Sequence, residues 1–135
     1  MMIKTALLIL TTSALLVGGQ AVHADPARDK IIADLARAAG TTLSAQRGQA
    51  FFTGTHSGGK PDSPSCTTCH TKDMRKPGAT RVGKPIDPMA VSVTRDRFTD
   101  PEKVAKWFKR NCNSVLGREC TATEQGDILT WLSSL

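Results

Sequence analysis

Cys66-Thr67-Thr68-Cys69-His70 is the most informative segment of this chain. The pattern C-x-x-C-H is the attachment motif for covalent haem. Two thiols one helical turn apart can form thioethers with the two vinyl groups of one haem, and the histidine that follows can reach the iron from the same porphyrin edge. We therefore predict one haem c, with Cys66 and Cys69 as its thioether residues and His70 as the proximal iron ligand.

A C-x-x-C pair also occurs in the redox disulfides of thioredoxin-like proteins and in zinc sites. The sequence around the motif has no βαβ pattern, and it has no second cysteine or histidine pair at the spacing of a zinc site. The full attachment motif occurs once. These features favour a haem over the two alternatives, and they favour a single one.

The N-terminal segment predicts export. Lys4 provides a positive charge, residues 6–17 form an apolar run, and residues 22–24 offer small residues at the cleavage positions. The apolar run is shorter than the roughly 20 residues that span a bilayer. We expect residues 1–24 to be a signal peptide, residues 25–135 to form one monohaem cytochrome c domain, and the mature protein to be periplasmic.

The chain is basic, with 18 Lys and Arg against 12 Asp and Glu and a formal charge of +6. The basic residues are scattered, and an exported protein meets little nucleic acid, so we expect no nucleic-acid partner. An acidic redox partner or an anionic substrate fits the surplus better, and an ordinary solvated surface is the alternative. Lys72, Arg75 and Lys76 are candidates for docking such a partner, and we expect a monomer.

Helical signals lie on both sides of the motif. One run begins at Asp25-Pro26, an N-cap followed by proline at the first helical position, and ends at Gly40. A second run opens at Ser44 and stops at Gly54. After the motif, Thr99-Asp100-Pro101-Glu102 combines a capping box with an early proline, and a further capping box opens a C-terminal helix at Thr121.

Residues 71–98 show no helical or strand period and contain several Gly and Pro residues. Loops this long are uncommon in compact domains unless they have a function, and wrapping a haem is one. We therefore predict an all-α fold similar to that of class I cytochromes c, with three or four short helices around one covalent haem and long wrapping loops. Class I cytochromes c cross two helices at a glycine and aromatic contact, and the candidates for that contact are Gly48, Phe51, Phe52 and Trp131.

The sixth ligand of the iron decides the function, because a strong ligand makes an electron carrier and a weak or absent one makes a site for small molecules. Met74 follows His70 too closely to reach across the porphyrin. His56 lies in a glycine-rich loop, and Met89 follows a proline in the long loop. Asn111 stands at the end of the helix that begins near Pro101, and Asn113 follows it. The residues alone leave His56, Met89, several lysines and the two asparagines, Asn111 and Asn113, open.

Cys112 and Cys120 remain once the motif has used the other two cysteines. In an oxidising compartment this pair should form a disulfide. In the wrapping loop, Arg81 and Lys84 are candidates for pairing with the haem propionates, and solvated surface charges are the alternative.

Three further segments carry a family resemblance: Gly58-Gly59-Lys60-Pro61-Asp62, Arg97-Phe98-Thr99-Asp100, and Asn111-Cys112-Asn113-Ser114-Val115 with Cys120. Together with the motif they resemble the family of sphaeroides haem protein (SHP) and cytochrome c″, over nearly all of the chain that follows residue 24. The resemblance implies that Asn111 is the sixth ligand of oxidised haem, where cytochrome c″ has a histidine, and that the 112–120 disulfide holds its segment. Relatives carry leucine near Met89, so Met89 stays an alternative ligand.

The resemblance also implies a function. An asparagine oxygen is a hard, weak donor that suits ferric iron better than ferrous iron, so reduction should release it. Ferrous haem would then be high-spin and open to dioxygen, nitric oxide or carbon monoxide, in an electron-transfer protein that acts as a terminal reductase or oxidase. The resemblance to SHP-like proteins also implies redox partners for this chain, namely a diheme c-type cytochrome linked to a membrane cytochrome b. A plain low-spin carrier with Met89 or His56 on the iron is the second hypothesis, a gas sensor is the third, and catalytic turnover stays undecided.

Overall fold

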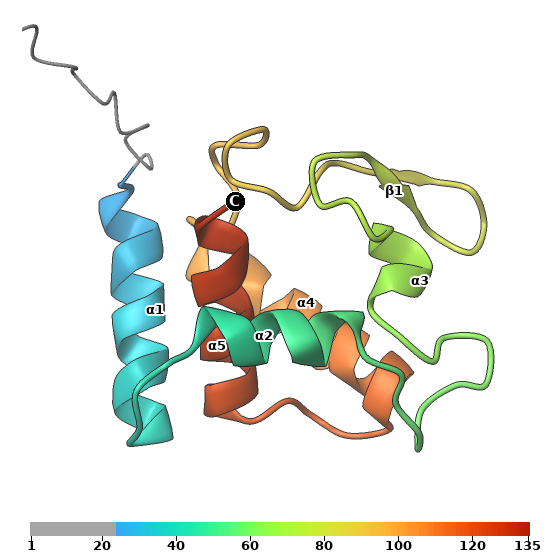
Figure 1. Ribbon diagram of the computed structural model, residues 1–135, viewed down its shortest axis with the longest axis horizontal. Helices are drawn as coiled ribbons and strands as arrows, with labels where there is room; N and C mark the ends of the chain where they lie inside the picture. The colour runs from blue at the N-terminus through green and yellow to red at the C-terminus, as the bar shows by residue number, and fades with distance from the viewer. Residues whose placement is uncertain (1–23) are drawn as a thin grey trace, which may run out of the picture.

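The computed structural model describes residues 24–135. Of the expected signal peptide, residues 1–24, only Ala24 therefore lies within the described part of the chain, so the cleavage and the domain boundary stay predictions. Among residues 24–135, no helix is both long and apolar enough to cross a membrane. These residues form five helices and one short two-stranded ribbon (Figure 1).

The first two helices have the bounds that their capping signals predict. Helix α1 spans Pro26–Ala39, with the Asp25 side chain accepting hydrogen bonds from two N–H groups of its first turn, and it ends at Gly40 with φ 62°. Helix α2 spans Ala45–Thr53 and is capped by the Ser44 hydroxyl. Local residue chemistry is sufficient to place both helices.

Helices α1 and α2 both pack against the C-terminal helix α5, Ala122–Ser133, and α2 crosses in front of α5 in Figure 1. The crossing is close because a Cβ atom on Gly48 would lie 2.0 Å from the backbone oxygen of Asp127. Next to it, the rings of Phe52 and Trp131 lie 5.5 Å apart. The predicted glycine and aromatic contact is confirmed for Gly48, Phe52 and Trp131. Helix α2, rather than the first helix α1, forms this contact with α5.

A buried carboxylate fastens the same crossing. Asp127 is 4% exposed and accepts a hydrogen bond from the backbone N–H of Ser44 at 2.6 Å. Its two oxygens also bind the Arg47 guanidinium, at 2.7 Å from Nε and 3.0 Å from the terminal nitrogen. A buried charge is tolerated when it is paired and hydrogen-bonded in this way. The start of α2 is thus held to the middle of α5.

Helix α4 spans Pro101–Leu116 and corrects two sequence expectations. Its N-cap is Asp100, whose carboxylate accepts from the Lys103 N–H at 3.0 Å, and the expected capping box at Thr99 is absent from this helix start. Proline at the first helical position makes the residue before it the cap. Asn111 was expected at the end of this helix, but α4 continues past it to Leu116, because no Gly or Pro interrupts residues 102–116.

The capping box of α5 is confirmed and is joined by an arginine. The Thr121 hydroxyl accepts from the Glu124 N–H, while a Glu124 carboxylate oxygen accepts from the Thr121 N–H. Arg118 donates to both oxygens of the same carboxylate, at 2.7 and 2.8 Å. These hydrogen bonds, the one from Arg118 first, lower the pKa of Glu124.

Replacing Glu124 with glutamine is expected to lower the free energy of unfolding by about 1 kcal/mol at neutral pH. Because the pKa of Glu124 is lower in the folded state, its contribution is present above the unfolded pKa and is lost as the pH falls through the folded value. Urea unfolding of both proteins at pH 7 and near pH 3 checks this. A difference of equal size at both pH values would contradict it.

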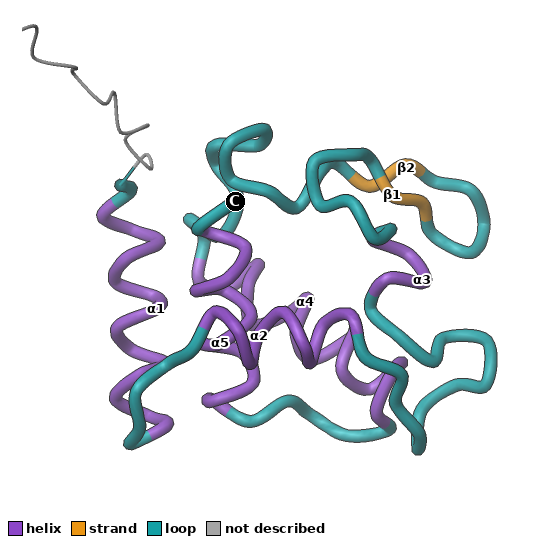
Figure 2. Tube along the Cα trace, viewed as in Figure 1, coloured by secondary structure: helices purple, strands orange, loops and turns teal. Residues whose placement is uncertain are grey.

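Between α2 and α4 the chain is mostly loop, as Figure 2 shows. It contains the short helix α3, Thr67–His70, and two strands of two residues each, β1 (Gly78–Ala79) and β2 (Pro85–Ile86), which pair antiparallel. The all-α class is confirmed. The helix count exceeds the expected three or four because the attachment motif forms α3, and the ribbon corrects the expectation of no strand.

Within residues 24–135, the core has two groups of buried side chains. The larger one joins α2, α5 and the long loop, and it consists of Phe52, Met74, Ala90, Ile128, Trp131 and Leu132. The smaller one joins α1, α4 and α5, and it consists of Ile31, Val104 and Leu129. Met74 is 3% exposed and packs within the first group.

Candidate functional site

A cavity of about 610 Å³ lies among the helices, and we call it the central cavity. Its volume is within the range of roughly 300–1,000 Å³ that is typical of cofactor and ligand pockets. Residues of α2, α3, α4 and α5 line it, together with the loop between β1 and β2 and the loop before α4. The lining includes most of the candidates from the sequence: Cys66, Cys69, His70, Arg81, Lys84, Met89 and Asn111.

Helix α3 presents the attachment motif to this cavity. The N–H groups of Cys69 and His70 donate to the carbonyl of Cys66 at 3.3 and 3.1 Å, so one tight turn brings the two thiols and the imidazole together. Both thiols are free. Burial raises the pKa of the Cys66 thiol to about 11, which keeps it protonated at neutral pH.

The His70 imidazole is half-buried and neutral. Burial, with a smaller contribution from the positive charge of Arg97, lowers the pKa of His70 to about 4. Its Nδ1 atom is buried without a hydrogen-bond partner among residues 24–135, and its ring lies 5.7 Å from the Phe52 ring. A neutral imidazole is the form that binds metal. Two free thiols and a neutral imidazole on one wall of a large cavity fit a haem c bound through the motif.

Two of the candidate sixth ligands reach the cavity and two do not. Asn111 lines it from α4, and Met89 lines it from the long loop. The Nε2 atom of His56 instead lies 2.7 Å from the carbonyl oxygen of Phe51, and His56 is not among the lining residues. The side chain of Asn113 donates to the Lys109 carbonyl at 2.7 Å and lies outside the lining as well.

A disulfide joins α4 to the loop that precedes α5. Cys112 and Cys120 are bonded, with Cα atoms 5.6 Å apart, which confirms the expected pairing. Both cysteines line the central cavity, and Cys112 directly follows Asn111. The part of α4 that carries Asn111 is therefore linked covalently to the C-terminal part of the chain.

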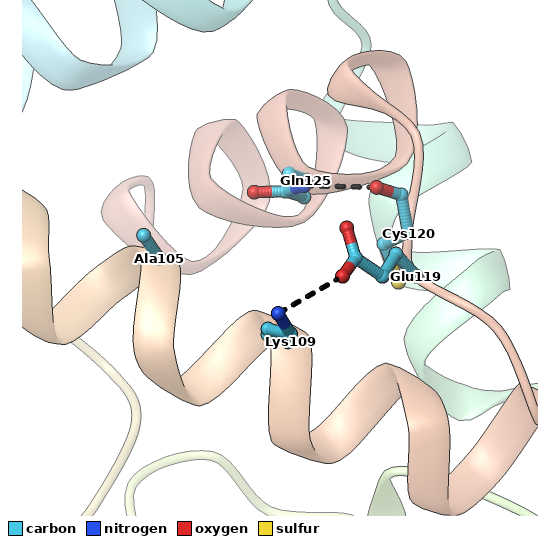
Figure 3. A pocket seen from close by; sticks show the side chains of 5 residues that line it. All are labelled: Ala105, Lys109, Glu119, Cys120 and Gln125. Atoms are coloured by element: carbon cyan, nitrogen blue, oxygen red, sulfur yellow. Dashed lines mark hydrogen bonds and ion pairs between the residues drawn. The ribbon is translucent and has the colours of Figure 1, made fainter.

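A hollow of about 220 Å³ lies between α4 and the start of α5, also against Cys120 (Figure 3). Across it, Lys109 pairs with Glu119 at 3.5 Å, and the Gln125 side chain donates to the Cys120 carbonyl at 2.9 Å. The ion pair adds to the disulfide in holding residues 119–120 against α4, and the hydrogen bond from Gln125 ties Cys120 to α5.

Arginines organise the loop side of the cavity. Arg81 and Lys84 line the cavity as the sequence suggested, but the Arg81 guanidinium donates to both carboxylate oxygens of Asp62 at 2.6 Å. Arg97, for which no role was predicted, also lines the cavity and donates to the carbonyls of Asp87 and Pro88, next to Met89.

Arg28 supports this loop from α1. Its side chain is 2% exposed and donates to the carbonyls of Arg95 and Arg97 at 2.5 and 2.9 Å. Sequence reasoning missed this residue, because an arginine in a polar helix start normally predicts a solvated charge. The carbonyl oxygens that Arg28 binds belong to residues 67 and 69 positions further along the chain, so no local sequence pattern indicates its role.

The comparison with known proteins identifies the family. Cytochrome c-type protein SHP of Cereibacter sphaeroides is 49% identical over 130 residues, which cover 96% of this chain and 98% of that protein. The chain belongs to the SHP and cytochrome c″ family. This family consists of monohaem c-type cytochromes, and its model, described as a domain of unknown function (DUF1924), matches residues 38–132.

Other members of the SHP and cytochrome c″ family agree with this. Cytochrome c″ of Methylophilus methylotrophus is 38% identical over 69 residues, half of this chain and 48% of that protein. The structure of oxidised SHP, described as an oxygen-binding cytochrome c, matches with a TM-score of 0.78 and 53% identity over 80% of this chain and 96% of that one. Oxidised cytochrome c″ matches with a TM-score of 0.68 and 29% identity over 78% and 92%.

Proposed function

We propose that this protein is an exported electron-transfer cytochrome with one covalent haem c, whose distal side is held by a weak asparagine ligand and opens to small ligands on reduction. The observation that carries the proposal is the composition of the central cavity. It combines the attachment motif on α3 with a neutral amide, Asn111, on the disulfide-linked part of α4.

The attachment residues have separate roles. Cys66 and Cys69 would form the two thioethers to a bound haem, and His70 would hold the iron through its imidazole, which partial burial keeps neutral. When bound, the haem supplies an iron that alternates between the ferric and ferrous states and binds diatomic gases in the ferrous state. Arg81 and Lys84 compensate the propionate charges at the cavity wall, with Arg81 shared with Asp62.

Asn111 provides the redox-dependent step. Its side-chain oxygen is a neutral hard donor that would stabilise ferric iron more than ferrous iron, so Asn111 would be released when the protein takes up an electron. Its relative SHP is described as an oxygen-binding cytochrome, and this chain shares 53% identity with the SHP structure. We extend that property to this protein and include nitric oxide and carbon monoxide, which are diatomic ligands of ferrous haem as well.

The wider role follows from the same proposal. A predicted signal peptide, residues 1–24, delivers the chain to the periplasm, where a redox partner protein reduces it. A diheme c-type cytochrome linked to a membrane cytochrome b is the partner that the family suggests. Transfer of the electrons to a bound ligand would make the protein a terminal reductase or oxidase.

Met89 supports a second candidate function, because it also lines the central cavity. A thioether on the iron would make a low-spin electron carrier without ligand binding. His56 has less support for that role, since its ring nitrogen is hydrogen-bonded to Phe51 and it does not line the cavity.

Replacing Asn111 with methionine is expected to produce a low-spin haem in both oxidation states and to lower the affinity of the ferrous protein for carbon monoxide at least tenfold. The reason is that a thioether binds ferrous iron better than an amide oxygen does. Absorption spectra of the ferric, ferrous and carbon monoxide-treated protein measure both effects.

Two further variants complete this test. Asn113→Met places the same side chain on α4 outside the cavity lining and should keep the wild-type spectra. Met89→Leu should also keep them. If Met89→Leu converts a low-spin wild type to high spin, Met89 is the ligand and the asparagine proposal is wrong.

A further inference from the structure

Trp107 is the large apolar side chain that α4 leaves in solvent. It is 52% exposed, and it also lines the central cavity. Of its α4 neighbours three and four positions away, Lys103 and Arg110 are charged and exposed. The indole therefore forms part of the wall that separates the cavity from the protein surface.

Two cations flank this ring. The Lys106 Nζ atom lies 5.9 Å from the ring centroid, and the Arg110 guanidinium carbon lies 5.3 Å from it. Arg110 follows Trp107 by three positions, which places both on one helix face. The cations make this face of the indole part of a basic surface, and we call Lys103, Lys106, Trp107 and Arg110 the Trp107 patch.

The positive charge of the patch is incompletely compensated. Lys103 lies 3.8 Å from Asp100, and the adjacent Lys109 lies 3.5 Å from Glu119 (Figure 3). Within residues 24–135, neither Lys106 nor Arg110 has a carboxylate within ion-pair distance. Two charges next to an exposed aromatic ring are thus available to an acidic surface.

We propose that the Trp107 patch is the docking surface for an acidic electron-donor protein, which delivers its electron through the wall of the central cavity. The proposal rests on the proposed function. The donor loses one electron and the ferric iron gains it, with no transfer of atoms. Tryptophan and arginine are enriched among the residues that contribute most to binding, and complementary charges accelerate encounter.

The basic residues after the attachment motif are the rival surface. Lys72, Arg75 and Lys76 were candidates for docking from the sequence, but none of them lines the central cavity. Lys76 also lies 3.8 Å from Asp73, which compensates part of its charge. Electron transfer becomes slower with distance, so the patch that contributes to the cavity wall is the better site.

The test uses the full haem-loaded protein and reduced flavodoxin, an acidic protein, as the electron donor in stopped-flow measurements. The first double variant, Lys106→Glu with Arg110→Glu, reverses the charge of the Trp107 patch. The second, Lys72→Glu with Lys76→Glu, reverses the charge of the rival surface. The third, Lys30→Glu with Arg37→Glu, makes the same change in net charge on α1. At low ionic strength, the patch variant should be reduced at least tenfold more slowly than the wild type. The other two should differ from the wild type by at most about threefold.

Salt dependence separates docking from damage to the haem site. Near 1 M salt the Debye length is about 3 Å, so the patch variant should come within about twofold of the wild type. A slow reaction that persists at high salt, or an equal or larger effect of the rival or α1 variant, would overturn the proposal. Carbon monoxide binding by the dithionite-reduced wild type reports the proposed function separately, because it requires no donor protein.

Discussion

Replacing Gly48 with alanine is expected to lower the free energy of unfolding by about 3 kcal/mol or more, despite the better helix propensity of alanine. The new Cβ atom would lie 2.0 Å from the Asp127 oxygen and 2.3 Å from the Asp127 carbonyl carbon. These are backbone atoms inside α5, so they cannot rotate away as a side chain can. Relief of the overlap requires α2 and α5 to separate.

Separation of these helices would also weaken the neighbouring contacts of Asp127 with Arg47 and of Phe52 with Trp131. Thermal unfolding of the haem-loaded protein should show a midpoint lower by about 10 °C or more. Gln49→Ala, on an exposed position of the same helix, is the matched control and should change the midpoint by little. An unchanged midpoint for Gly48→Ala would contradict the close crossing.

Replacing both Cys66 and Cys69 with alanine is expected to abolish covalent haem attachment. Both thiols lie free on the wall of the central cavity, within one turn of His70. Haem staining of the protein after denaturing electrophoresis should fall to background. The variant should also be much less stable, because a cavity of about 610 Å³ without its cofactor leaves the surrounding apolar side chains unpacked.

The second cysteine pair is the control for this result. Replacing Cys112 and Cys120 with serine removes the disulfide, which is worth about 2.5 kcal/mol for so short a loop, but leaves both thioether residues in place. That variant should retain full haem staining. Covalent haem in the Cys66 and Cys69 double variant, or its loss from the serine variant, would contradict the assignment of the two pairs.

The sequence predicted those features that depend on neighbouring residues. The attachment motif, the caps at Asp25, Ser44 and Thr121, and the stop at Gly40 are each determined by a few adjacent side chains. The start of α4 was misjudged by one residue, because Thr99 and Asp100 are both good caps and the choice depends on the position of Pro101. The ribbon between β1 and β2 is too short to produce a period.

The sequence could not predict contacts between distant parts of the chain. Arg28 reaches carbonyls 67 and 69 positions away, and Asp127 pairs with Arg47 80 positions away. Neither residue belongs to a motif. By contrast, the placement of Asn111 inside α4, rather than at its end, could have been read from the sequence, because no Gly or Pro interrupts residues 102–116.

The most direct test of the account is a carbon monoxide titration of the wild-type protein, followed by absorption spectroscopy in the ferric, ferrous and ligand-bound states. If Asn111 is a weak ligand that withdraws on reduction, the ferrous protein should be high-spin and should bind carbon monoxide tightly, and the ferric protein should lack the near-infrared band of an axial methionine. A ferrous protein that is low-spin and does not react with carbon monoxide would contradict the account.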